Sequence, residues 1–495
     1  MSIQKGIDQK IKVKPAYFQL IHTTAYEGPC RLGSGEQLTP EFDEKIGHAK
    51  FKRFKETLKT YSDEIEFLEP ELLTWTDEFI LREEQFKKLS NDVGKADLFL
   101  FDGVFHQFPA SEISQRFHVP VGVIGCCAST DGVAGLRNAG LEAYGFIDPE
   151  DANRQLKLMR TKIALRNTRV LAILKNDVVS KGVLSTITDL QQLTRDLGIQ
   201  FTFINAEDLF DALRAITPEQ EAAAEQIAKD LIDQAEYSDM TLENIVRSTR
   251  FYVVIRALLE HYECNAFTMP CFEVCATRKF NDEFRCTPCL VHTLLKEEGI
   301  PSACESDLNA LVAMTVLINL TRKAPHMGNT HPYASEIKTD ESTPSGLELI
   351  PEIEDKRNIV STWHAVQTRK MKGIDGPLMP YHITPFTQAG WGATIRYDFS
   401  RDIGEPITLL RFHPSGKKML AVKAVIVAGA GKDTVGCSTG LYYQVADSRD
   451  MFRKMLDFGH HYTWVYGDYI DDLKELGEVM GVDVVTAYPG EFPYE

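Results

Sequence analysis

The chain of 495 residues is too long for one ordinary hydrophobic core, so we expect about two to four domains. Hydrophobic residues make up 43% and charged residues 25% of the chain, as in ordinary globular enzymes. The formal net charge of −17 argues against a nucleic-acid partner, because a phosphate-binding surface needs clustered Lys and Arg.

The sequence gives no sign of secretion or of a membrane-spanning segment. The first residues carry scattered lysines and no continuous apolar stretch, so no signal peptide is predicted. No run of about 18 apolar residues is present, and no membrane-spanning helix is predicted. The ten cysteines are irregularly spaced, which is typical of reduced thiols in a cytosolic protein, and we expect a cytoplasmic location.

The first third of the chain alternates strand and helix signals. Short apolar runs of this kind are buried in parallel sheets. Strands are predicted over residues 16–22, 97–101 and 121–126, a helix over 43–61 and a loop over 127–132. This part is interpreted as an N-terminal α/β domain, residues 1–167.

A second α/β unit is predicted from about residue 168 to residue 340. Strands are expected over residues 170–174, 199–204 and 265–269, an amphipathic helix over 183–197, and two outer helices within 218–263. Further along, Thr287 and Pro288 indicate the start of a helix that Gly299 ends, because glycine adopts the left-handed conformation readily. A strand should follow over residues 300–304, and an apolar helix should begin at Leu308.

Acidic side chains follow two strands of this second unit. Glu305 and Asp307 come directly after the strand at 300–304, and Glu273 comes after the strand at 265–269. Because ligands collect at the carboxyl ends of parallel strands, these acids favour a metal or acid/base site. The alternative is that Asp307 only caps the next helix and that Glu305 is a solvated loop acid.

Four cysteines near these acids allow a second interpretation. Their spacing, CxxxC followed by CxxC, is compatible with a structural zinc site. We favour buried free thiols, because the second pair flanks a helix start and free cysteine packs as a small hydrophobic residue. The four are Cys271, Cys275, Cys286 and Cys289.

The last third of the chain changes character. Residues 326–332 read as a polar loop and residues 335–357 as a domain linker. Short β-rich runs follow at 407–412, 419–422 and 424–427, then a helix over 468–480 and a strand over 482–485. The segment GAGKDT at 429–434 is a turn rather than a phosphate loop, because Asp433 follows Lys432 where Ser or Thr is needed. The predicted fold is therefore α/β, with two Rossmann-like parallel-sheet units followed by a β-rich C-terminal domain (antiparallel sheet or barrel), residues 341–495.

Two motifs resemble the L-fucose and L-arabinose isomerase superfamily: GIPSACESDLNALVAM, and FGHHYTWVYGDYIDDLKELGEVMGVDVV near the end. The resemblance covers roughly residues 170–490. It implies the architecture just described, assembled as homotrimers or homohexamers with sites shared between subunits. It also implies a metal-dependent aldose–ketose isomerase that acts on a monosaccharide through a cis-enediol, with Mn²⁺ or another divalent cation such as Mg²⁺ or Co²⁺ as cofactor.

By match to the motifs, the resemblance implies a metal set of Glu273, Glu305, Asp307 and His461, with the three acids also as catalytic residues. Fucose-type members carry the metal acid at the position of Asp307 and arabinose-type members at that of Glu305, so which acid is ligand and which is base stays open. Glu283 competes with Glu273 for the role of the early acid.

Six further residues are candidates for substrate binding. His331 and His364 lie where related chains place histidines, although His331 is equally interpreted as solvated and His364 as an edge-strand residue packed on Trp363. His460 is a candidate partner of His461. The stretch FTQAGWGATIR is interpreted as a sugar-facing loop that contributes Gln388, Trp391 and Arg396.

The identity of the sugar stays open between a pentose, a 6-deoxyhexose and a hexose with a charged substituent. The alternative function is a non-catalytic sugar-binding or regulatory protein on the same scaffold, since fold alone does not fix function. Such a binder would not need a complete set of acids and histidine.

Overall fold

The computed structural model describes residues 3–23, 34–78, 80–178, 182–332, 357–432 and 435–487. The chain forms two compact units, Gln9–Arg160 and a larger unit of Met1–Asp8 with Thr161–Glu495. The division at residues 167 and 340 stays a prediction. The predicted linker at 335–357 falls outside the described residues, except for Arg357.

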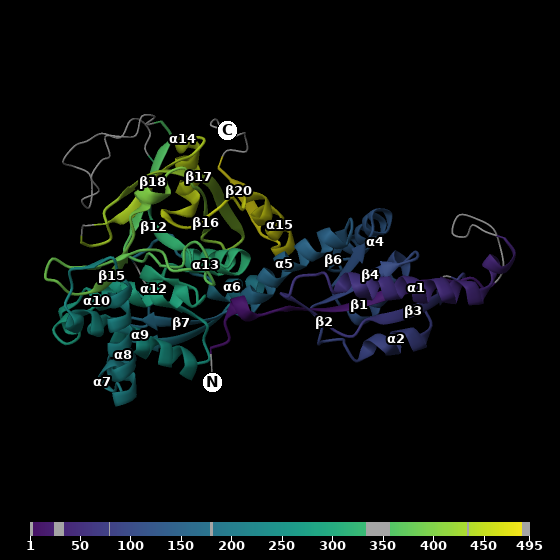
Figure 1. Ribbon diagram of the computed structural model, residues 1–495, viewed down its shortest axis with the longest axis horizontal. Helices are drawn as coiled ribbons and strands as arrows, with labels where there is room; N and C mark the ends of the chain where they lie inside the picture. The colour runs from purple at the N-terminus through teal and green to yellow at the C-terminus, as the bar shows by residue number, and fades with distance from the viewer. Residues whose placement is uncertain are drawn as a thin grey trace. The chain divides into compact units, whose positions relative to one another are not determined.

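The smaller unit is a parallel sheet flanked by helices (Figure 1). The strand order is β2-β1-β4-β5-β6, and β3 pairs with the second half of β1. Its strands are β1 (Ile11–Ile21), β2 (Ile65–Phe67), β3 (Glu71–Thr76), β4 (Leu98–Gly103), β5 (Val121–Ile124) and β6 (Ala143–Phe146). Its helices are α1 (Pro40–Leu58), α2 (Glu83–Ser90), α3 (Gln107–Phe117), α4 (Cys126–Asn138) and α5 (Pro149–Arg166), the last of which runs into the larger unit.

The predicted strands of this unit are confirmed, but the predicted loop at 127–132 is wrong. Those residues form the first turns of α4. The strand gives way to this helix at Gly125, whose φ of 108° is open to glycine but not to most other residues. The small and polar residues after Gly125 suggested a loop, but the first turns of a helix do not need an apolar stripe.

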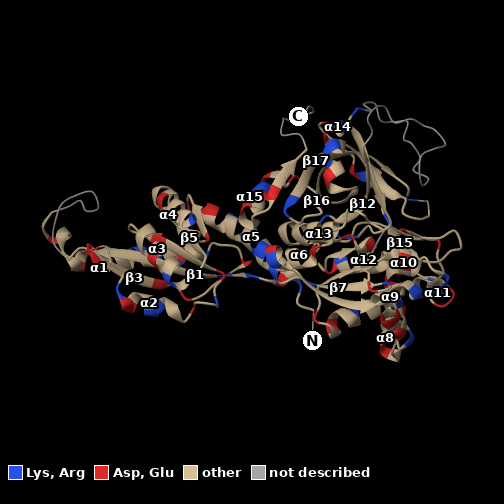
Figure 2. Ribbon diagram, turned by 180° about the vertical axis from the view of Figure 1, so that it is seen from behind, with Lys and Arg blue, Asp and Glu red and all other residues tan. Residues whose placement is uncertain are grey.

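The larger unit begins with a second parallel sheet, in the order β11-β10-β7-β8. Its strands are β7 (Arg169–Leu174), β8 (Gln200–Asn205), β10 (Ala266–Thr268) and β11 (Ser302–Ala303). Its helices are α6 (Leu190–Leu197), α7 (Ala206–Arg214), α8 (Pro218–Gln234), α9 (Leu242–His261), α10 (Cys271–Cys275), α11 (Arg278–Asn281), α12 (Cys289–Glu297) and α13 (Leu308–Thr321). The two outer helices are confirmed as α8 and α9, and acidic residues lie along α8 (Figure 2).

The predicted helix over 183–197 is wrong in its first half. The helix starts only at Leu190, where the Asp189 carboxylate accepts a hydrogen bond from the Gln192 amide at 2.8 Å. A side-chain cap of this kind satisfies an amide that the first turn leaves free.

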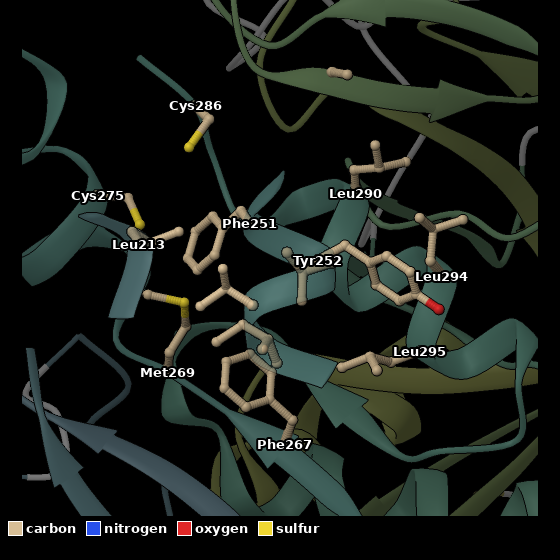
Figure 3. Packing of buried hydrophobic residues seen from close by; sticks show 14 of the residues in the cluster. Leu213, Phe251, Tyr252, Phe267, Met269, Cys275, Cys286, Leu290, Leu294 and Leu295 are labelled. Carbon is tan, nitrogen blue, oxygen red and sulfur yellow. The ribbon is translucent and has the colours of Figure 1, made fainter. Parts of the chain in front are cut away.

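The apolar core of this sheet packs against α9 and α12 (Figure 3). It includes Leu290, Leu294 and Leu295 of α12. Gly299 has a φ of 79° just after the helix, as predicted, and a Cβ there would lie 2.3 Å from Ile7. The following helix, α13, carries no Lys, Arg, Asp or Glu, and it is tan throughout in Figure 2.

The C-terminal part is a closed antiparallel barrel of six strands. They run in the order β16-β19-β12-β13-β18-β17, and β17 pairs back to β16. The strands are β12 (His326–Pro332), β13 (Ile359–His364), β16 (Pro406–Phe412), β17 (Lys418–Ala430), β18 (Thr439–Gln444) and β19 (His461–Tyr466). Around it lie β20 (Asp483–Thr486), which pairs with β17, and the helices α14 (Ser448–Phe458) and α15 (Ile470–Met480).

The predicted fold class is thus confirmed, with two corrections in this region. The expected polar loop at 326–332 is strand β12, whose ladder bonds to β13 and β19 order a polar sequence. The two runs at 419–422 and 424–427 belong to one strand, β17, which has an irregularity between Ile426 and Ala428. A separate sheet joins β9 (Tyr237–Ser238), β14 (His382–Pro385) and β15 (Ala393–Arg396).

No helix among the described residues combines the length and the apolar character needed to cross a membrane.

Candidate active site

Glu305 lies in a strained turn between strand β11 and helix α13. The turn, η3 (Cys304–Ser306), places Glu305 at φ 61° and Ser306 at φ 51°, both in the left-handed region. Such a conformation costs roughly 1–2 kcal/mol for each residue that has a Cβ. The Ser306 amide donates to the Met269 carbonyl at 3.0 Å, which ties the turn to the end of β10. The strain aims the Glu305 carboxylate, which is only 6% exposed.

Asp307 is fully buried and all of its oxygens are engaged. Oδ1 accepts a hydrogen bond from the Ala310 amide at 3.1 Å, so Asp307 caps α13 as one interpretation of the sequence expected. Oδ2 accepts from Arg411 Nη1 at 2.8 Å, and both side chains are 0% exposed. The same Oδ2 lies 3.2 Å from His461 Nδ1. Asp307 is therefore both a helix cap and the centre of a buried charged cluster.

His461 is brought to these acids by the barrel. It is the first residue of β19, and its register partner on β12 is Asn329. Because an ionised carboxylate only accepts hydrogen bonds, Nδ1 donates to Asp307. Nε2 lies 3.0 Å from Asn329 Oδ1 and 3.7 Å from Glu305 Oε2.

His364 reaches the same point from β13. Its Nε2 lies 3.5 Å from Glu305 Oε1, and its ring is 5.7 Å from that of His461. Ligand atoms of Glu305, His364 and His461 lie within 4.8 Å of one another, and all three residues are buried. Since β13 lies between β12 and β18, the edge-strand interpretation of His364 is wrong.

The charges in this group are set by burial and by close partners. Burial acts to raise the pKa of Glu305, but His364 and then His461 lower it by more, so the carboxyl group is ionised at neutral pH. Burial also acts to raise the pKa of Asp307, while Arg411 and His461 hold it well below its usual value. Burial lowers the pKa of His364, which leaves its imidazole neutral and able to bind a cation.

The neighbouring histidines are arranged differently. His331 stacks on Trp363, with ring centroids 5.2 Å apart and planes 8° apart. Among the described residues its Nε2 has no hydrogen-bond partner, although the atom is buried. His460 is exposed, and its ring centroid lies 4.5 Å from that of His461. Trp363 thus packs on His331 rather than on His364.

The predicted sugar-facing loop is the turn of the β14–β15 hairpin. Gln388 is exposed and Trp391 is half-buried. Arg396 is 0% exposed, and its guanidinium donates only within the protein. The five acceptors are Thr384 Oγ1, Thr394 Oγ1, Ser438 Oγ, Thr439 Oγ1 and the Gly436 carbonyl. A guanidinium satisfied in this way has a structural role.

The two candidates for the early acid are placed differently. Glu283 is exposed and forms an ion pair with Arg214 at 2.8 Å. Glu273 is half-buried on α10, which packs against the turn that carries Glu305, and its Oε2 is buried. In the described part of the chain, no group of three candidate metal ligands within 4.8 Å of one another includes Glu273.

The cysteines of the zinc interpretation do not gather. Cys275 and Cys286 belong to the apolar core around Phe251 and Met269 (Figure 3). In the described ranges, no candidate ligand group contains Cys275, Cys286 or Cys289. These three pack as buried thiols, and burial raises the pKa of each.

Two residues of the cluster were not identified from the sequence. Arg411 lies on β16 and Asn329 on β12, and each reaches the cluster only through the strand pairing of the barrel. The one hint was a cation in an otherwise apolar strand, PITLLRF, because a buried arginine needs an anionic partner.

Known proteins are similar to this chain over 69% of its length. No family model matches the chain. A sulfoquinovose isomerase of Priestia aryabhattai and one of Priestia megaterium are each 22% identical over 355 residues, a match that covers 69% of this chain and 70% of each relative. A sulfoquinovose isomerase of Alkalicoccus urumqiensis is 21% identical over 360 residues, covering 69% and 72%.

The chain is a relative of the aldose–ketose sugar isomerases. The relationship confirms the resemblance carried by the two motifs, and with it the prediction of an enzyme of the sugar isomerase class.

Proposed function

We propose that this isomerase is metal-dependent and interconverts an aldose and a ketose through a cis-enediol. The observation that carries the proposal is the approach of Glu305, His364 and His461 to within 4.8 Å of one another in a relative of sugar isomerases. One ionised carboxylate and two imidazoles form a compact ligand set in a buried position.

The donor set suits a divalent cation of intermediate hardness. Carboxylate with imidazole favours Mn²⁺, with Mg²⁺ and Co²⁺ as alternatives, over ions that select thiolates. Nδ1 of His364 is buried without a hydrogen-bond partner in the described structure, and Nε2 has the 3.5 Å contact with Glu305. A buried polar nitrogen of this kind is costly unless a ligand satisfies it. A cation bound there would act as a Lewis acid toward sugar oxygens that gain negative charge.

The surrounding residues hold the ligands in position. Asp307 accepts from His461 Nδ1 and so orients the ring, with Nε2 turned toward Glu305 and Asn329. Arg411 holds Asp307 through its ion pair. We therefore assign Asp307 to positioning rather than to proton transfer, since both of its oxygens already accept hydrogen bonds.

Glu273 is our candidate for the group that moves the proton between C1 and C2. A base must reach the substrate and still be able to accept a proton. The lowered pKa of Glu305 suits a ligand better than a base. Glu273 lies on α10, just after the adjacent strand β10, and is half-buried.

Sulfoquinovose, the sugar in the relatives' names, is the first substrate to test, followed by pentoses and 6-deoxyhexoses. Metal-free protein should be inactive, and Mn²⁺ should restore ketose formation. A reaction through an enediol in D₂O should also introduce solvent deuterium at C2 of the recovered aldose. Glu305→Gln should lose metal and turnover together, whereas Glu273→Gln should keep its metal and lose kcat. Full activity of metal-free protein would contradict the proposal.

The assembly and the location are also proposals. The family resemblance supports a homotrimer or homohexamer, and light scattering should give three or six times 55.8 kDa. A monomer at micromolar concentration would exclude both. The cytoplasmic location remains the expectation stated from the cysteine pattern, and fractionation of cells with an antibody to the chain would test it.

A further inference from the structure

Two thiols face each other directly beside Glu305. Strands β10 and β11 pair in parallel, with Thr268 opposite Ala303, and Cys271 and Cys304 follow the two strand ends. The Cys304 thiol donates to Cys271 Sγ at a sulfur–sulfur distance of 3.5 Å. Both cysteines are free.

The two sulfurs and a Glu305 oxygen form their own ligand group. Ligand atoms of Cys271, Cys304 and Glu305 lie within 4.8 Å of one another. This group is separate from the carboxylate–imidazole set, except that Glu305 belongs to both. One carboxylate therefore stands between a side lined by nitrogen and a side lined by sulfur.

The spacing of the sulfurs fits a shared ion. Two sulfurs at about 2.3 Å from a tetrahedral Zn²⁺ are about 3.8 Å apart. The observed 3.5 Å is close to that value without any movement of the backbone. Cys271 is half-buried, so an ion from solvent has access to the pair.

Apolar packing does not account for these two thiols. Cys275 and Cys286 lie in the apolar core, whereas the sulfurs of Cys271 and Cys304 lie within 4.8 Å of a carboxylate oxygen of Glu305. Burial, and then Cys289, Cys271 and Glu305, raise the pKa of the Cys437 thiol. Such a surrounding of thiols and a carboxylate is favourable for a soft cation, because a bound cation offsets the negative charge that the ligands carry once they lose their protons.

We propose that Cys271, Cys304 and Glu305 form a second cation site, selective for soft divalent ions such as Zn²⁺ and Cd²⁺. Thiolate ligands select these ions over Mn²⁺ and Mg²⁺. Three protein ligands leave a fourth tetrahedral position open to water. Because Glu305 serves both sites, a soft ion at the sulfur side competes with the ion held by His364 and His461. That competition rests on the proposed function, whereas binding at the sulfur side does not.

The test uses the full chain, reduced and freed of metal, with Cd²⁺ alone as the probe. Titration should produce the ultraviolet charge-transfer band of cadmium thiolate with one strong site per chain. Cys271→Ser should weaken Cd²⁺ binding by about a hundredfold or more, beyond the loss typical of an outer residue. Cys126→Ser is the matched control, because Cys126 is an exposed free cysteine in the other compact unit and should bind as the wild type does.

Two further measurements separate the parts of the proposal. Glu305→Gln should keep the thiolate band but lower Cd²⁺ affinity by about tenfold; unchanged affinity would overturn the sharing of Glu305. If the double variant Cys271→Ser/Cys304→Ser kept the thiolate band and the wild-type Cd²⁺ affinity, the proposed site would be wrong. Wild-type protein that shows no thiolate band at equimolar Cd²⁺ would also overturn it. A thiolate band in protein that binds no Mn²⁺ at all would support the sulfur site and would count only against the proposed function. Circular dichroism of each variant establishes that it is folded.

Discussion

Exchanging Asp307 for asparagine separates its role as a helix cap from its role in the buried charged cluster. Asn keeps a carbonyl oxygen that can accept from the Ala310 amide, and Asn caps helices about as well as Asp. The new amide group, however, places two N–H donors against Arg411 Nη1 and His461 Nδ1, which are donors themselves. A buried arginine would then have lost its anion.

The magnitude follows from the geometry of the pair. At 2.8 Å the attraction between Arg411 and Asp307 is about 6 kcal/mol for an effective dielectric constant of about 20. Desolvation of both groups offsets part of this, and removing one partner from a fully buried pair costs about 3–5 kcal/mol. We therefore expect Asp307→Asn to lower the free energy of unfolding by about 4 kcal/mol. A cap alone predicts almost no loss.

Urea unfolding followed by circular dichroism measures the difference, with metal-free protein so that ligand binding does not contribute. Asp189→Asn is the control, because Asp189 caps α6 through the Gln192 amide but is exposed. It should change the free energy of unfolding by less than about 0.5 kcal/mol. If Asp307→Asn were as mild as Asp189→Asn, the charged cluster would contribute nothing and Asp307 would be a cap only.

Three further outcomes are expected. The difference in unfolding free energy between wild type and Asp307→Asn should shrink on acidification. Burial acts to raise the pKa of Asp307, but its charged partners hold that pKa below the usual value, so the carboxylate stabilises the fold fully above about pH 4 and less as the pH falls toward the folded-state pKa. Urea midpoints of both proteins at pH 7 and pH 3 would measure the change. His364→Ala should weaken Mn²⁺ binding by more than the tenfold to hundredfold loss that is typical when a residue supporting a metal ligand is removed, and His460→Ala should weaken it by less. Equilibrium dialysis measures both affinities, and equal losses would contradict the assignment. Arg396→Met should destabilise the protein by about 3 kcal/mol in urea because it leaves buried acceptors unpaired, yet should leave the metal content unchanged.

The acidic half of the site was predictable because its signals are local. Glu305 and Asp307 stand between a glycine-terminated helix and a strongly apolar helix, and that order fixes them at a strand end. The core strands of both parallel sheets were predicted for the same reason, since their apolar runs are short and bounded. The capping role of Asp307 followed from its position alone.

The imidazole half was only partly predictable. His461 came from a family motif, and its contact with Asn329 depends on the register between β12 and β19. Strand register in a barrel is decided by pairing between distant segments, which no local pattern encodes. For the same reason the polar strand β12 was taken for a loop, and Arg411 was not connected with Asp307 although the two form the most buried ion pair of the site.

The barrel that carries His461 also determines when, during synthesis, the proposed cation site of Glu305, His364 and His461 can form. Glu305 is synthesised before its two imidazole partners. His364 lies on β13 and His461 on β19, and both strands pair with β12 in the barrel; β19 ends at Tyr466. A nascent chain therefore emerges from the ribosome with acids and thiols but without the complete nitrogen-bearing pocket. Pairing across more than a hundred residues is slow compared with helix formation. Under the proposed function, Cys271, Cys304 and Glu305 are already present during that interval while His461 is not, so a thiol-seeking ion has access to Glu305 before the carboxylate–imidazole set is complete.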